Sequence, residues 1–162
     1  MNSIIFKELC LKTARILNLP EAEYFSNGEV VTFDDIDIQF IQDTNNGNLA
    51  RLFMELGDLD FIDRVEVYEA LFSIQLMMEG VVDGQFVLDN LHDRMMFVVR
   101  LPLSEQTQAE QLADVIESFV QQVIQWRATI FSGYLFDDRF EPESNRPPAL
   151  NEQPIQMVAS LA

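Results

Sequence analysis

The chain has 162 residues, the size of one ordinary domain, and its side chains are 48% hydrophobic and 10% aromatic. This apolar content predicts a folded core rather than a disordered chain. The 27 acidic and 10 basic side chains give a formal net charge of −17, which disfavours nucleic acid and anionic membranes as partners.

Residues 2–19 have the apolar spacing of a helix, and Pro20 follows as a stop signal. The start of the chain has no basic stretch before a long apolar run, and no later run reaches the roughly 18 apolar residues of a membrane span. Cys10 is the single cysteine, so no internal disulfide forms, and we interpret it as a structural residue of the helix. We therefore expect a soluble cytoplasmic protein.

Three strands are predicted next. Residues 29–33 and 36–41 contain β-branched and aromatic side chains alternating with polar ones, and they join near Asp34 and Asp35. Asn46 and Gly47 form a strong hairpin turn signal before a returning strand over residues 49–56. The pattern predicts a three-strand antiparallel meander.

Residues 63–79 predict a second helix, N-capped by Asp63, whose apolar side chains cover most of its circumference. One sheet cannot bury such a helix, so a second surface must cover it. We expect a homodimer formed through this helix and the strand that follows it. The predicted dimer residues are Tyr68, Leu71, Phe72, Gln75, Met78, Phe86 and Leu88.

Two more strands are predicted over residues 85–89 and 95–101. A third helix begins between Ser104 and Thr107, where Thr107 and Glu110 fit a capping box, and runs to about Phe131. After it, four of the six prolines lie among polar residues. The chain is thus predicted to be an α+β domain over residues 1–131, followed by a flexible acidic tail over residues 132–162.

The sequence offers no assembled catalytic or metal site. His92 is the only histidine, and no phosphate loop, nucleotide fingerprint or nucleophile elbow occurs. The segment 43–47 resembles a calcium loop, but Met54 stands where the bidentate glutamate is required. We expect no enzyme activity, no cofactor and no metal, although paired carboxylates such as Asp34 and Asp37 leave a small hydrolase as one alternative.

The order of elements and several local motifs resemble the class I type III secretion chaperones, also called the Tir chaperone family. The resemblance covers roughly residues 1–131. It is carried by Leu17-Asn18-Leu19, Phe33-Asp34-Asp35-Ile36-Asp37-Ile38, Leu56-Gly57-Asp58-Leu59, Tyr68-Glu69-Ala70-Leu71-Phe72, Gly84-x-x-Val87-Leu88-Asp89, Leu101-Pro102-Leu103, Phe119-Val120 and Trp126-Arg127. The resemblance implies a homodimeric virulence chaperone that presents the N-terminal segment of a secreted effector or translocon-associated protein to the secretion apparatus.

Such a client segment, in an extended form, is expected to place apolar side chains in grooves and to add a strand to an exposed sheet edge. The negative surface would steer basic client residues in a salt-dependent manner. A different class of function also fits the composition, namely an acidic adaptor or inhibitor that binds a folded partner. The predicted client-binding residues are Ile5, Leu9, Leu17, Phe33, Ile38, Phe40, Leu52 and Met54.

Overall fold

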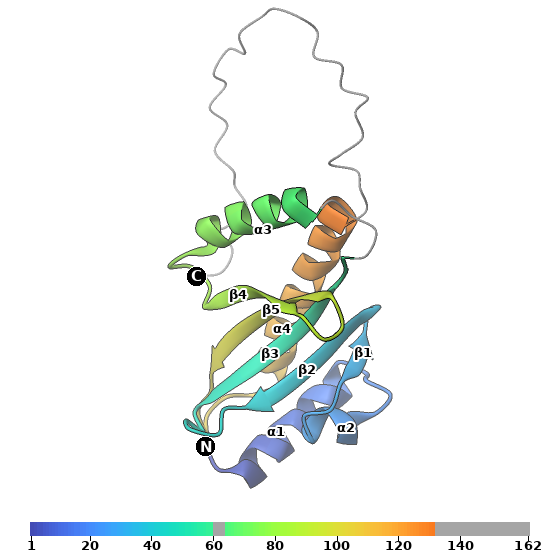
Figure 1. Cartoon of the computed structure of the whole chain (residues 1–162). Coiled ribbons are helices and arrows are strands. Elements are labelled where there is room, and N and C mark those ends of the chain that lie inside the picture. Colours follow the sequence, from blue (N-terminus) through green and yellow to red (C-terminus); the bar gives the residue numbers. More distant parts are fainter. Residues whose placement is uncertain (60–63, 132–162) are drawn as a thin grey trace, which may run out of the picture.

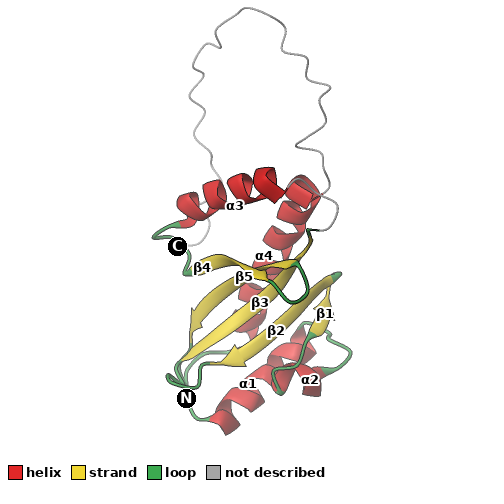
Figure 2. Cartoon of the chain, in the orientation of Figure 1, coloured by secondary structure: helices red, strands yellow, loops and turns green. Residues whose placement is uncertain are grey.

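The computed structural model describes residues 1–59 and 64–131 of the chain, and it has the predicted α+β fold (Figures 1 and 2). In chain order the elements are α1 (Ser3–Ile16), α2 (Ala22–Ser26), β1 (Val31–Phe33), β2 (Ile36–Gln42), β3 (Leu49–Asp58), α3 (Arg64–Met78), β4 (Gly84–Asp89), β5 (Arg94–Pro102), α4 (Ala109–Trp126) and the π-helical turn η1 (Arg127–Phe131).

The five strands form one antiparallel sheet in the order β1-β2-β3-β5-β4. The predicted meander and the predicted pair of later strands therefore join through β3 and β5, which lie side by side (Figure 2). This arrangement leaves β1 and β4 as the two edges of the sheet. Edge strands matter for function because they can pair with another chain.

The core lies on one face of the sheet, where α1, α2 and α4 contribute side chains. Ile38, Phe40 and Leu52 are fully buried there, and their neighbours along each strand point to the other face. The Phe40 ring lies 5.5 Å from the ring of Phe6 on α1 and stacks at 5.7 Å on Phe25 of α2. Aromatic side chains of α1 and α2 thereby cover Phe40 on this side of the sheet.

The helix boundaries refine two expectations. The predicted first helix stops at Ile16 rather than Leu19, and the short α2, which the sequence did not predict, follows it. The predicted Thr107–Glu110 capping box is wrong, because the Thr107 hydroxyl accepts from the Ser104 N–H at 2.9 Å. Helix α4 is instead capped from Gln108, whose N–H donates to the Gln111 side chain at 3.3 Å.

Helix α3 stands apart from the sheet face and lies along the edge near β4 (Figure 1). Only Val67 and Leu71 are buried among its residues. The predicted cap Asp63 and the predicted tail over residues 132–162 lie outside the described residues. In the described part of the chain, no helix is both long enough and apolar enough to cross a membrane.

Candidate functional site

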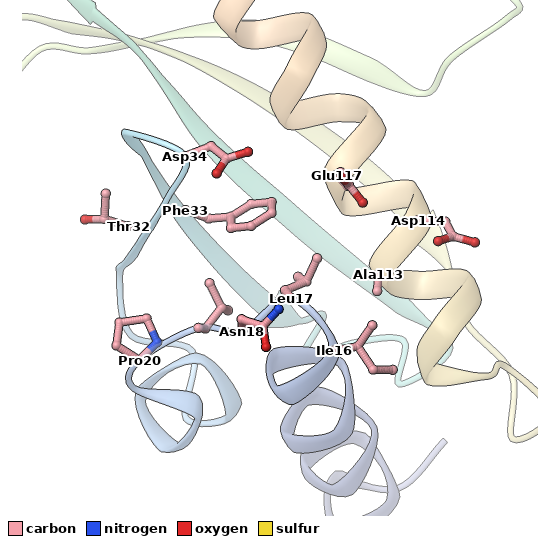
Figure 3. A pocket seen from close by; sticks show the side chains of 11 residues that line it. Ile16, Leu17, Asn18, Pro20, Thr32, Phe33, Asp34, Ala113, Asp114 and Glu117 are labelled. Carbon is pink, nitrogen blue, oxygen red and sulfur yellow. The ribbon is translucent and has the colours of Figure 1, made fainter.

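A pocket of about 590 Å³ opens where the end of α1, strand β1 and the middle of α4 meet (Figure 3). Its walls come from parts of the sequence as much as 101 residues apart, from Ile16 to Glu117, which the fold brings together. The residues that line it are Ile16, Leu17, Asn18, Leu19, Pro20, Thr32, Phe33, Asp34, Ala113, Asp114 and Glu117. Because β1 is an edge strand, the pocket lies beside a free strand edge.

The α1 wall is shaped by the way this helix ends. Asn18 adopts the left-handed conformation, with φ 54°. The Leu19 N–H donates to the Ala14 carbonyl at 2.9 Å, and the Asn18 N–H donates to the Arg15 carbonyl at 3.2 Å. These two bonds form a Schellman motif, which satisfies the last carbonyls of the helix and turns the chain sharply. The turn places Leu17 and Leu19 at the pocket.

The opposite wall is the hairpin between β1 and β2. Asp34 and Asp35 are its two central residues, and both have positive φ, at 50° and 63°. A two-residue turn of this kind matches strand twist, but it costs residues other than glycine about 1 kcal/mol or more each. Helix α4 holds the turn, because Gln121 Nε2 donates to Asp34 Oδ2 at 3.1 Å.

Arg127, which directly follows the last residue of α4, also forms hydrogen bonds with the sheet and its hairpin. Its guanidinium donates from Nη1 to the Asp35 carbonyl at 2.8 Å and from Nε to the Leu56 carbonyl at 2.9 Å. A planar guanidinium can serve several acceptors at once, which a lysine cannot do in the same geometry. The hydrogen bonds of Gln121 and Arg127 hold the hairpin against α4, so the pocket is preformed.

The pocket combines an apolar floor with an acidic rim. Figure 3 shows the Phe33 ring pointing from the hairpin towards α4, with Leu17 in the same space. Asp34, Asp114 and Glu117 are exposed around them, and no ion pair within the described residues involves these three carboxylates. Such a surface suits an apolar or long basic side chain, whose stem can lie on the floor while its charge meets the rim.

The predicted client-binding residues divide into two groups in the structure. Leu17, which is itself a core residue only 8% exposed, and the half-buried Phe33 line the pocket, and Ile5 is half-buried on α1. The other five belong to the hydrophobic core and do not form part of an accessible groove; they are Leu9, Ile38, Phe40, Leu52 and Met54. The physical reason is that α1, α2 and α4 cover the sheet face to which the strand residues point. Contact with a client stays a prediction for Ile5, Phe33 and the Leu17 side chain in the wall of the pocket.

A second surface lies on α3. Phe72 is 70% exposed and Leu76 is 72% exposed, and Val65 and Met77 are also largely exposed. Residues 65, 72 and 76 share one side of the helix, because side chains three to four positions apart lie on the same face. The predicted excess of apolar surface on this helix is therefore confirmed in the protomer, whereas the dimer itself stays a prediction.

The other predicted dimer residues are buried or half-buried within the single chain. Leu71 is buried, and Tyr68, Gln75, Met78 and Leu88 are half-buried. Phe86 is also half-buried, and its ring lies 5.1 Å from the ring of Phe97 and 5.3 Å from that of Trp126. These contacts leave Phe72 as the most exposed member of the predicted set.

The described residues show little that resembles a catalytic centre. No group of three or more His, Cys, Asp or Glu side chains in residues 1–59 and 64–131 could hold a metal ion. His92 contacts Asp89 at 2.6 Å in an exposed turn, and this contact, together with backbone N–H groups, lowers the pKa of Asp89. Burial raises the pKa of the Cys10 thiol to about 12, which keeps it neutral and unreactive.

Comparisons with known proteins agree with this picture. The model of the Tir chaperone protein (CesT) family matches residues 13–127. A chain of the ExsC–ExsE complex has a similar fold, with a TM-score of 0.63 at 14% identity over 76% of this chain and 92% of that one. A chain of the HopA1–SchA chaperone–effector complex aligns with a TM-score of 0.55 at 14% identity, over 78% and 95% of the two chains. No curated protein matches the sequence significantly.

Proposed function

The chain belongs to the Tir chaperone protein (CesT) family, and on this premise we propose that it is a type III secretion chaperone. It binds an extended N-terminal segment of a secreted effector or translocon-associated protein and keeps that segment soluble and competent for secretion. The observation that carries the proposal at the level of residues is the preformed pocket beside the free edge of β1. The chain acts by binding and not by chemistry.

Strand β1 supports the addition of a client strand. Phe33 pairs with Ile36 across the two-residue turn, and Thr32 pairs with Asp37. Hydrogen-bonded and non-hydrogen-bonded pairs alternate in an antiparallel ladder, so the N–H and C=O of Thr32 point away from β2. These two groups are available to an incoming backbone. The strand is only three residues long, so a client needs additional contacts.

The pocket supplies those additional contacts. A client strand on the β1 edge passes close to Phe33 and Leu17, where one of its side chains enters the pocket. Asp34, Asp114 and Glu117 favour a basic residue at or next to that position. The net charge of −17 attracts basic segments over longer distances, and salt weakens this attraction.

The functional unit is a homodimer in this proposal. The exposed side chains of Val65, Phe72 and Leu76 form an apolar strip on one side of α3, which a second copy of the chain covers through the same strip. A two-fold axis pairs identical patches, so each apolar residue contributes twice to the interface. One client chain can then pass over both protomers and bind two pockets.

The proposal is tested with the complex purified from the bacterium that encodes the chain. The copurifying protein is identified by mass spectrometry and then made in two pieces, the N-terminal segment and the folded remainder. We expect the N-terminal piece alone to bind and to become resistant to protease. Binding that requires the folded remainder contradicts the proposal and favours an acidic adaptor that recognises a folded partner.

A further inference from the structure

The sheet has a second edge, formed by β4, and this edge faces α3. Gln75 of α3 contacts the β4 backbone with both ends of its side-chain amide. Its Nε2 donates to the Gly84 carbonyl at 2.8 Å, and its Oε1 accepts from the Phe86 N–H at 3.1 Å. The side chain therefore satisfies one acceptor and one donor on the edge of the strand.

These two backbone groups are the ones that a neighbouring strand would use. The residues on either side of Gln85 direct their hydrogen-bonding groups to the outer edge, while Gln85 itself faces β5, opposite Val98. In a parallel pairing, one residue of the added strand donates to the carbonyl before its partner and accepts from the N–H after it. The Gln75 amide reproduces this pair of bonds, so it occupies the edge as one residue of an added parallel strand would.

Helix α3 also contacts the region of β4 through its other end. Arg64, the first residue of α3, forms an ion pair with Asp93 in the turn between β4 and β5. The helix is thus tied to both ends of the β4 region, and Gln75 lies at the end where β4 begins. Among the described residues, no side chain bonds to the β1 backbone at Thr32 in the same way.

We propose that Gln75 closes the outer edge of β4 to pairing with another chain and thereby makes β1 the edge that accepts a client strand. Open edges invite pairing between copies and aggregation, and proteins commonly block them. Gln75 acts as a positioning residue, because it directs where a strand can add without contacting the client. The second half of the proposal rests on the proposed function, whereas the first half concerns the chain alone.

Hydrogen exchange of the Phe86 amide, followed by NMR, tests the closure of the edge. Gln75→Leu keeps the size of the side chain but removes both hydrogen bonds, and Gln75→Asn keeps an amide that is too short to reach both groups. We expect the Phe86 N–H to exchange at least about tenfold faster in both variants, while Phe97 and Val98 on β5 exchange at the wild-type rate. Gln125→Leu, at an exposed glutamine of α4, is the matched control and leaves Phe86 protected.

The same measurement in a Phe72→Glu background separates the effect of Gln75 from that of a dimer that covers α3. Wild-type exchange at Phe86 in Gln75→Leu, or in Gln75→Asn if the leucine variant does not fold, overturns the closure of the edge. With a client bound to the wild-type chain, new protection at Thr32 supports the choice of β1, and new protection along β4 overturns it. Failure to find any client contradicts the proposed function and leaves the exchange result for Gln75 standing.

Discussion

Phe72→Glu is expected to convert the proposed homodimer into a monomer. Complete burial of a Phe, Leu or Met side chain contributes about 1.5–3 kcal/mol, so a side chain that is 70% exposed in the protomer gains about 1–2 kcal/mol when a partner covers it. The two-fold axis doubles the loss to about 2–4 kcal/mol per dimer. Two buried carboxylates add a desolvation penalty, so the dimer dissociation constant should rise at least about 100-fold.

Analytical ultracentrifugation over a concentration series measures this change directly. The matched control is Ile4→Glu, which places the same charge at a 69% exposed apolar residue of a different helix and should leave the dimer intact. Circular dichroism shows whether both variants keep the fold. A Phe72→Glu chain that dimerises as tightly as the wild type, or a wild-type chain that is monomeric at micromolar concentration, refutes the assignment of α3 as the dimer surface.

Three further predictions follow from the site and its supports. Thr32→Pro removes the outward N–H of β1 and should reduce client affinity about tenfold in a binding titration, whereas Thr32→Ala, which loses only the 2.7 Å side-chain bond to Asp37, should bind nearly as the wild type does. Arg127→Lys loses the guanidinium that donates hydrogen bonds to the Asp35 and Leu56 carbonyls, and it should lower the free energy of unfolding by about 2–4 kcal/mol in urea denaturation. An unchanged free energy of unfolding would contradict the stabilising role of Arg127. Cys10 should resist iodoacetamide at pH 8 in the native chain, and rapid native labelling would contradict its burial. Because the pKa of Cys10 rises to about 12 on folding, the contribution of the neutral thiol to stability is complete below pH 9 and is lost as the pH rises towards 12.

Most of the fold could be predicted from the sequence because periodicity reports local structure directly. The turn at Asp34 and Asp35, the meander, the later strands and the long helices all appear near their predicted places. Helix α2 could not be predicted, because five residues are too few to show a helical period. Helix α4 begins at Ala109, two to five residues after the predicted range of Ser104 to Thr107, because Thr107 forms a hydrogen bond in the turn before the helix.

The residues of the candidate pocket could be predicted only in part, because the sequence does not show which face of the sheet is covered. Alternation shows which strand residues share a face but does not show which face the helices cover. Ile38, Phe40 and Met54 share the covered face and became core residues, whereas Phe33 at the end of β1 remains at the pocket.

The grouping of acidic residues at the rim of the pocket could not be predicted from the sequence either. Asp34 comes from a turn, and Asp114 and Glu117 come from a helix some 80 residues later, so only the packing of α4 against the hairpin brings them together. The apolar surface of α3, in contrast, was predictable, because a helix that is apolar nearly all round cannot be buried by one small sheet.

The most direct test of the central claim is hydrogen exchange by mass spectrometry on the chain with its client, compared with the chain alone. We expect new protection at residues 31–34 and around the pocket, together with a protected N-terminal segment of the client that lacks a fold of its own. Protection confined to other surfaces of the chain, or a client bound through its folded domain, would contradict the addition of a client strand at β1.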